Sequence, residues 1–149
     1  RLFPNARFIH IARNPCDVYY STNHTLRKMF ELFLLEEHPG DFSDFVITEY
    51  KALMEQYLKD RALIPEGNLA EVKYEDLVAD PLRELERIYA TLGLSDWESG
   101  GKQAVIEYLS TLSDYQKNTF EPDPDAMARI SRTWRFAFEE WNYELPVKL

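Results

Sequence analysis

The feature that most constrains the fold is a short apolar segment that leads directly into a helix-start signal. Residues 7–12 read Arg-Phe-Ile-His-Ile-Ala, and a short run of β-branched and aromatic residues predicts a buried strand. Arg13, Asn14 and Pro15 follow. Asparagine is a preferred N-cap residue, and proline suits the first position of a helix. The sequence therefore predicts a strand, a single arginine, and a helix that runs to about Phe30.

Most of the remaining sequence has helical periodicity. Apolar residues at helical spacing predict helices over about 42–62, 81–92 and 102–112, and a closing helix from 124 that carries Met127, Ile130, Trp134, Phe138 and Trp141 on one face. Residues 69–74 alternate and predict a second strand. Two strands rarely form a stable sheet alone, so we expect that partner strands are missing from this sequence. The expected organisation is one α/β unit in which helices dominate.

Composition excludes several classes of protein. The net charge of −9 argues against a general nucleic-acid binder and against binding to an anionic membrane. The only cysteine, Cys16, excludes an intramolecular disulfide framework, and the three histidines lack metal-ligand spacing, so no metal site is expected. No apolar stretch approaches 18 residues, so no membrane span is expected. We interpret the chain as cytoplasmic and, because it opens on Arg1 without a leader pattern, as cut from a longer protein.

The junction after the first predicted strand has the features of an anion site. A helix N-terminus offers free backbone N–H groups and the positive end of the helix dipole. Arg13 precedes this helix start, and a guanidinium binds phosphate through two hydrogen bonds. Ser21 lies seven residues after Asn14, so the two share one helix face. The pattern predicts an anion that lies along this face and contacts both Arg13 and Ser21.

Three segments resemble one enzyme family. Residues 7–21, with Arg-Asn-Pro-Cys-Asp-Val at 13–18 and Ser21, are similar to the 3′-phosphate-binding segment of sulfotransferases, which use 3′-phosphoadenosine 5′-phosphosulfate (PAPS). Residues 72–77 (Val-Lys-Tyr-Glu-Asp-Leu), followed by Asp-Pro at 80–81 and Leu-Gly-Leu at 92–94, resemble the family's strand beside the adenine pocket. Residues 115–118 and 134–143 look like the C-terminal region of bacterial-type sulfotransferases. The order and spacing of the three segments carry the resemblance.

The resemblance implies a fold, a reaction and a set of site residues. The fold would be a P-loop-kinase-like parallel sheet with flanking helices, and residues 1–149 would be its helix-dominated C-terminal portion. Arg13 and Ser21 would bind the 3′-phosphate, Tyr74 would contact adenine, and Lys117 would be a weaker candidate for the phosphate. The enzyme would move a sulfuryl group from PAPS to a hydroxyl or amine acceptor, which is a small molecule or a conjugate, and would release 3′-phosphoadenosine 5′-phosphate (PAP).

One part of the family's donor site is missing from the sequence. The family's phosphosulfate loop is rich in glycine and follows the first strand, but no glycine precedes Arg13. Gly100-Gly101-Lys102 does not form a P-loop, because residue 96 is Asp and residue 103 is Gln. The catalytic residues therefore stay unassigned, and we expect the isolated chain to be inactive.

Two other classes of function remain open from the residues alone. A non-catalytic helical interaction module would explain the many aromatic residues, and another nucleotide-dependent transferase, such as a kinase, would also use a phosphate site. Tyr74 has a structural interpretation as a core residue, and Cys16 as an inert thiol despite its place in the first turn of a helix. Exposed core would also favour a homo-oligomer.

Overall fold

The chain forms two compact units. The computed structural model describes residues 3, 5–33, 40–112 and 119–147. The strand unit comprises Arg1–Arg13 and Asp60–Lys117, and the helical unit comprises Asn14–Lys59 and Asn118–Leu149. The sequence pattern had suggested a single unit, because no linker composition marks the division.

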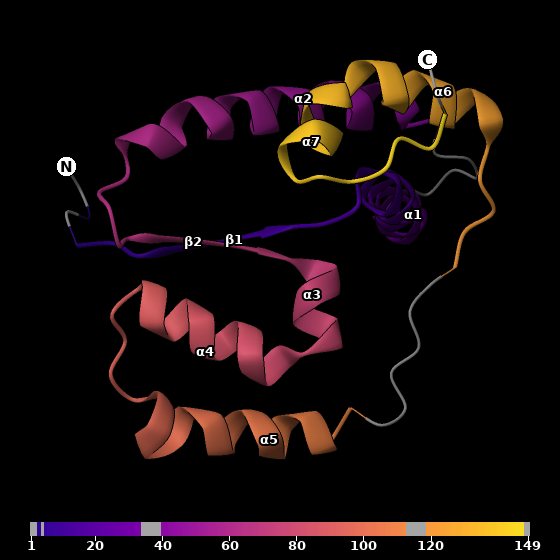
Figure 1. The fold of residues 1–149 in the computed structure, drawn as a ribbon. Helices are drawn as coiled ribbons and strands as arrows, with labels where there is room; N and C mark the ends of the chain where they lie inside the picture. The colour runs from indigo at the N-terminus through magenta and orange to yellow at the C-terminus, as the bar shows by residue number, and fades with distance from the viewer. Residues whose placement is uncertain (1–2, 4, 34–39, 113–118, 148–149) are drawn as a thin grey trace. The chain divides into compact units, whose positions relative to one another are not determined.

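The strand unit contains a two-stranded parallel sheet. Strand β1 spans Phe8–Ala12 and β2 spans Leu69–Lys73, with Phe8 opposite Leu69 and Ala12 opposite Lys73 (Figure 1). The predicted second strand was one residue too long, because Tyr74 already belongs to a helix. Alternation of side chains carries through Tyr74 in the sequence, whereas the backbone of Lys73 is the last in extended conformation before the helix begins.

Short helices cover the sheet of the strand unit. The core of this unit lies between β2 and the helices that follow it, and its buried side chains are Ala70, Val72, Ile88 and Leu92. The Asp80 side chain caps the longest of these helices by accepting a hydrogen bond of 3.1 Å from the Arg83 backbone N–H. The helical elements of this unit are η1 (Arg61–Leu63), α3 (Tyr74–Ala79), α4 (Pro81–Thr91), η2 (Trp97–Gly101) and α5 (Lys102–Ser110).

The helical unit is built around one buried tryptophan. Trp134 is fully buried, donates its indole N–H to the Ile47 carbonyl at 2.9 Å, and packs its ring 4.1 Å from the centroid of Tyr50. The core around it also contains the buried side chains of Tyr19, Val46, Ile47, Ala126, Met127, Ile130 and Phe138. The elements of this unit are α1 (Pro15–Phe33), α2 (Ser43–Asp60), α6 (Pro124–Thr133) and α7 (Arg135–Glu140).

The predicted closing helix was wrong in one respect. It is two helices, α6 and α7, which meet at Trp134. Trp134 has a φ of −109° and a ψ of 16°, outside the helical range, and its buried indole N–H bond holds this position. The core aromatic residues 134, 138 and 141 are nevertheless buried, as their spacing predicted.

Several apolar residues in the helix predicted over about 42–62 and in the first predicted strand are exposed. Phe45 and Leu53 of α2 are 56% and 63% exposed, whereas Val46 and Ile47 of the same helix are buried. In the strand unit, Ile9 and Ile11 of β1 are about half exposed, at 51% and 52%. The sequence predicted this strand to be buried, and that part of the prediction is wrong, because only Ala12 of β1 is buried.

Candidate functional site

The end of the two parallel strands brings together two residues that the sequence had singled out. Arg13 directly follows β1 and Tyr74 directly follows β2, and the register pairs their neighbours Ala12 and Lys73. The Arg13 guanidinium carbon lies 4.5 Å from the centroid of the Tyr74 ring, which is a cation–π contact. This edge is where parallel sheets of α/β proteins bind ligands. The structure thus places a positioned cation at the carboxyl edge of the sheet.

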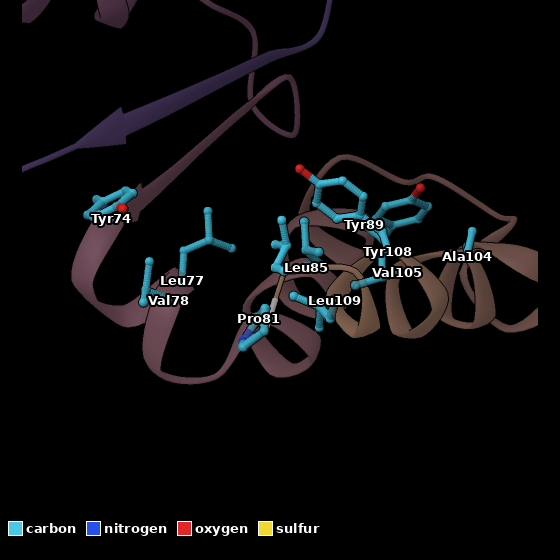
Figure 2. A pocket seen from close by; sticks show the side chains of 12 residues that line it. Tyr74, Leu77, Val78, Pro81, Leu85, Tyr89, Ala104, Val105, Tyr108 and Leu109 are labelled. Atoms are coloured by element: carbon cyan, nitrogen blue, oxygen red, sulfur yellow. The ribbon is translucent and has the colours of Figure 1, made fainter. Parts of the chain in front are cut away.

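The Tyr74 ring also lines an apolar cavity in the strand unit (Figure 2). The cavity has a volume of about 810 Å³, within the range of small-molecule sites. Its wall comes from α3, α4 and α5 and includes Leu77, Leu85 and Leu109. Apart from tyrosine hydroxyls and backbone, this wall presents only apolar groups. A cation therefore stands beside a cavity suited to a flat, weakly polar group.

The helix start that the sequence predicted is confirmed in the helical unit. The Asn14 side chain accepts a hydrogen bond of 2.9 Å from the Cys16 backbone N–H, and Pro15 begins α1. The Asn14 carbonyl accepts from the Val18 N–H at 3.0 Å, which is the first bond of the helix. An acidic residue, Asp17, occupies the first turn, where the helix dipole favours it.

The other two predicted site residues are Ser21 and Lys117. Ser21 is a half-buried residue of α1, and its carbonyl accepts a hydrogen bond of 2.8 Å from the Thr25 hydroxyl. It belongs to the helical unit, whereas Arg13 and Tyr74 belong to the strand unit. Lys117 lies outside the described residues. Of the four predicted site residues, Arg13 and Tyr74 are the pair that the structure brings together.

Cys16 has none of the properties of a reactive thiol. Burial raises the pKa of its thiol to about 11, and the negative charge of Asp17 acts in the same direction. The position in the first turn of α1 does not outweigh these effects. The interpretation of Cys16 as an inert residue agrees with this environment.

A second, more polar cavity lies in the helical unit, and the sequence had not pointed to it. It has a volume of about 370 Å³ and is lined by residues of α1, of the start of α2 and of the segment before α6. Asn23 of this wall is 8% exposed. A sequence signal for it exists, because Asn23 stands four residues after Tyr19 and three before Leu26 on an otherwise apolar face of α1.

Two kinds of feature are absent from the part of the chain that the structure describes. Among residues 3, 5–33, 40–112 and 119–147, no helix is long and apolar enough to cross a membrane. Within those same ranges, no three His, Cys, Asp or Glu side chains gather as they would to hold a metal ion.

Comparison with known proteins finds one matching family and several related sulfotransferases. The profile of the sulfotransferase family matches residues 1–99, a range that contains Arg13, Ser21 and Tyr74 but not Lys117. The omega-hydroxy-beta-dihydromenaquinone-9 sulfotransferases Stf3 of Mycobacterium bovis and Mycobacterium tuberculosis are each 31% identical over 144 residues, which is 96% of this chain. A flavonol sulfotransferase-like protein of Flaveria bidentis is 29% identical over 118 residues, or 75% of this chain.

The relatives are considerably longer than this chain. The chain spans 37% of each mycobacterial protein and 38% of the Flaveria protein. No solved structure matches the chain. Because the family profile covers residues 1–99 of 149, we conclude that the chain belongs to the sulfotransferase family.

Proposed function

We propose that this chain carries the 3′-phosphate and adenine half of the PAPS site of a sulfotransferase. The observation that carries the proposal is the Arg13–Tyr74 pair at the carboxyl edge of the sheet. A guanidinium that an aromatic ring holds in place meets a phosphate with little further loss of side-chain freedom. The apolar cavity that continues from Tyr74 offers room for a planar base.

The residues fit the charge distribution of the donor. The 3′-phosphate of PAPS is a dianion, and Arg13 supplies a permanent cation at the strand end. Ser21 would add a hydroxyl donor and Lys117 a second cation, as the family resemblance implies. PAPS supplies the sulfuryl group that is transferred, and the role of these residues is to bind and orient its nucleotide end.

The proposed reaction moves a sulfuryl group from PAPS to an acceptor and releases PAP. The names of the mycobacterial and Flaveria relatives refer to an omega-hydroxy menaquinone and a flavonol, both of which are hydroxyl compounds. A hydroxyl acceptor is therefore the first class to test, ahead of an amine. We further propose that residues 1–149 form the C-terminal portion of the sulfotransferase domain; the low coverage of the relatives supports a portion of a longer protein, and the C-terminal placement comes from the family resemblance alone.

Binding of PAP by the purified chain tests the proposal. In isothermal titration calorimetry, we expect PAP to bind more tightly than AMP, which lacks the 3′-phosphate. Loss of the charge-assisted bonds in Arg13→Ala should weaken PAP binding by about tenfold to a hundredfold and leave AMP nearly unchanged. Arg135→Ala is the matched control, because Arg135 pairs with Glu139 on the surface of the helical unit.

Two results would contradict the proposal. Equal affinity for PAP and AMP in a chain that circular dichroism shows to be folded would exclude a working 3′-phosphate site. Sulfuryl transfer from PAPS by the isolated chain would contradict the expectation that the chain holds only part of the site.

A further inference from the structure

The apolar cavity of the strand unit is larger than one base requires. Its volume of about 810 Å³ lies in the upper part of the range for sites that hold a whole small molecule. Figure 2 shows the Tyr74 ring, at the start of α3, at one end of the cavity and Ala104 and Tyr108 of α5 at the other. Leu85 and Leu109 lie between them. A base in contact with Tyr74 therefore leaves the end beside α5, which we call the α5 end, unfilled.

Packing against a buried tryptophan holds one wall of the α5 end in place. The Tyr89 ring lines this end, and its centroid lies 5.1 Å from that of Trp97, which is only 5% exposed. A Cβ atom at Gly101 would stand 3.3 Å from the Tyr89 hydroxyl oxygen, so a side chain there would press on this tyrosine. Glycine at 101 thus leaves Tyr89 room to pack against Trp97. The α5 end is therefore preformed, as ligand cavities usually are.

The wall of the α5 end favours a hydrocarbon group. None of the described residues that line the cavity carries a charge. Val105 and Leu109 of α5 are half-buried and Tyr108 is 63% exposed, so apolar surface at this end faces water. A charged group would lose its hydration there without gaining an ionic partner from the wall, whereas a hydrocarbon group would gain from burial.

The end of the cavity at Tyr74 lies beside a positive charge. The Arg13 guanidinium carbon is 4.5 Å from the centroid of the Tyr74 ring. A nucleotide whose 3′-phosphate binds Arg13 therefore places its ribose at the Tyr74 end and its base in the cavity. In adenine, the edge that carries the amino group points away from the ribose, whereas carbon 8 lies on the ribose side. The amino edge of such a base faces the α5 end.

We propose that the α5 end is a hydrocarbon subsite, and that this chain binds a 3′-phosphorylated purine nucleotide more tightly when the amino edge of its base carries an alkyl group. The inference rests on the proposed nucleotide site and adds to it a second region of contact, beyond the base. Ala104, Val105 and Tyr108 are the residues of α5 that cover the alkyl group.

Alkylated forms of PAP test the subsite on the unaltered chain. In calorimetric titrations, PAP is compared with PAP that carries a methyl or a butyl group on the amino group of the base. Each CH₂ group that is buried should tighten binding by about twofold to fourfold, so the butyl form should bind at least about eightfold more tightly than the methyl form. PAP with a butyl group on carbon 8 is the matched control, because it directs the same hydrocarbon toward the ribose side and should show no such gain.

A pair of variants locates the alkyl group. Val105→Ser removes apolar surface from the α5 end, so the affinity ratio of the butyl form to the methyl form should fall by about half or more. Ile106→Ser is the matched control, because Ile106 is the next residue of the same helix and is 42% exposed but does not line the cavity. The ratio should be unchanged in that variant.

The outcomes separate this proposal from the one on which it rests. If PAP binds more tightly than AMP but the butyl form binds no better than the methyl form, the subsite is refuted and the 3′-phosphate site stands. An equal gain from a butyl group on carbon 8 would also refute the subsite, because the hydrocarbon would then lie elsewhere. If the folded chain does not distinguish PAP from AMP, the nucleotide site fails and the subsite fails with it.

Discussion

The contact between Arg13 and Tyr74 can be measured as a coupling free energy. Both side chains are half-buried, and the guanidinium carbon lies 4.5 Å from the ring centroid. Cation–π contacts contribute from about 0.5–1 kcal/mol when exposed to about 2 kcal/mol when desolvated. For a half-buried pair we expect about 1 kcal/mol, which is about a fivefold change in an equilibrium constant.

A double-mutant cycle isolates this value. Arg13→Met keeps most of the chain length and removes the charge, and Tyr74→Leu removes the ring. Arg13 has other interactions besides this one, and the cycle cancels them because they are lost equally in both arms. The readout is native-state hydrogen exchange at the amide of Val72, a buried residue of β2 in the same unit. We expect the double variant to be less destabilised, by about 1 kcal/mol, than the sum of the single variants.

A matched cycle provides the control. Tyr108→Leu removes another tyrosine from the same cavity, one that is 63% exposed and lies on α5. Its coupling to Arg13→Met should be close to zero. If the Arg13–Tyr74 coupling is also below about 0.3 kcal/mol, the ring does not hold the guanidinium, and the positioning on which the proposed phosphate site depends is refuted.

Two further perturbations probe the helical unit. Trp134→Phe leaves the Ile47 carbonyl without its indole donor at a fully buried position. We therefore expect the free energy of unfolding to fall by about 1–3 kcal/mol, measured as a lower midpoint of unfolding in urea. An unchanged midpoint would show that this hydrogen bond of 2.9 Å contributes nothing to stability. Because burial raises the pKa of Cys16 to about 11, its thiol should stay protonated at pH 8 in the folded chain. It should then react with iodoacetamide far more slowly than in the urea-unfolded chain, and the rate should rise as the pH approaches 11. Equal reaction rates in the folded and unfolded chain at pH 8 would contradict this environment.

The parts of the fold that local rules govern were predictable from the sequence. Asn14 and Pro15 mark a helix start by chemistry that acts within three residues, and the structure has the helix start there. Strand β1 follows from β-branched residues in a short run. The end of β2 was missed by one residue, since an alternating pattern does not reveal where the backbone leaves the extended conformation at Tyr74.

Features that depend on distant residues could not be read from the sequence. The break at Trp134 is one, because apolar residues keep helical spacing across it and only the bond to Ile47, 87 residues away, shows what holds it. The division into two units is another. The polar cavity is intermediate: Asn23 interrupts an apolar face, which is a readable signal, but Phe120 comes from a part of the chain whose position no local pattern predicts.

The candidate phosphate site depends on the register of the parallel strands as much as on its residues. Arg13 and Tyr74 meet because Ala12 is paired with Lys73, so each strand ends at the same level. A slip of one residue would turn the side chains of β2 to the opposite face and would take Ala70 and Val72 out of the core that they form with Ile88 and Leu92. Burial of these two small residues therefore fixes the register, and the register places the guanidinium against the ring. The same packing that stabilises the strand unit thus positions the cation that we propose for the 3′-phosphate.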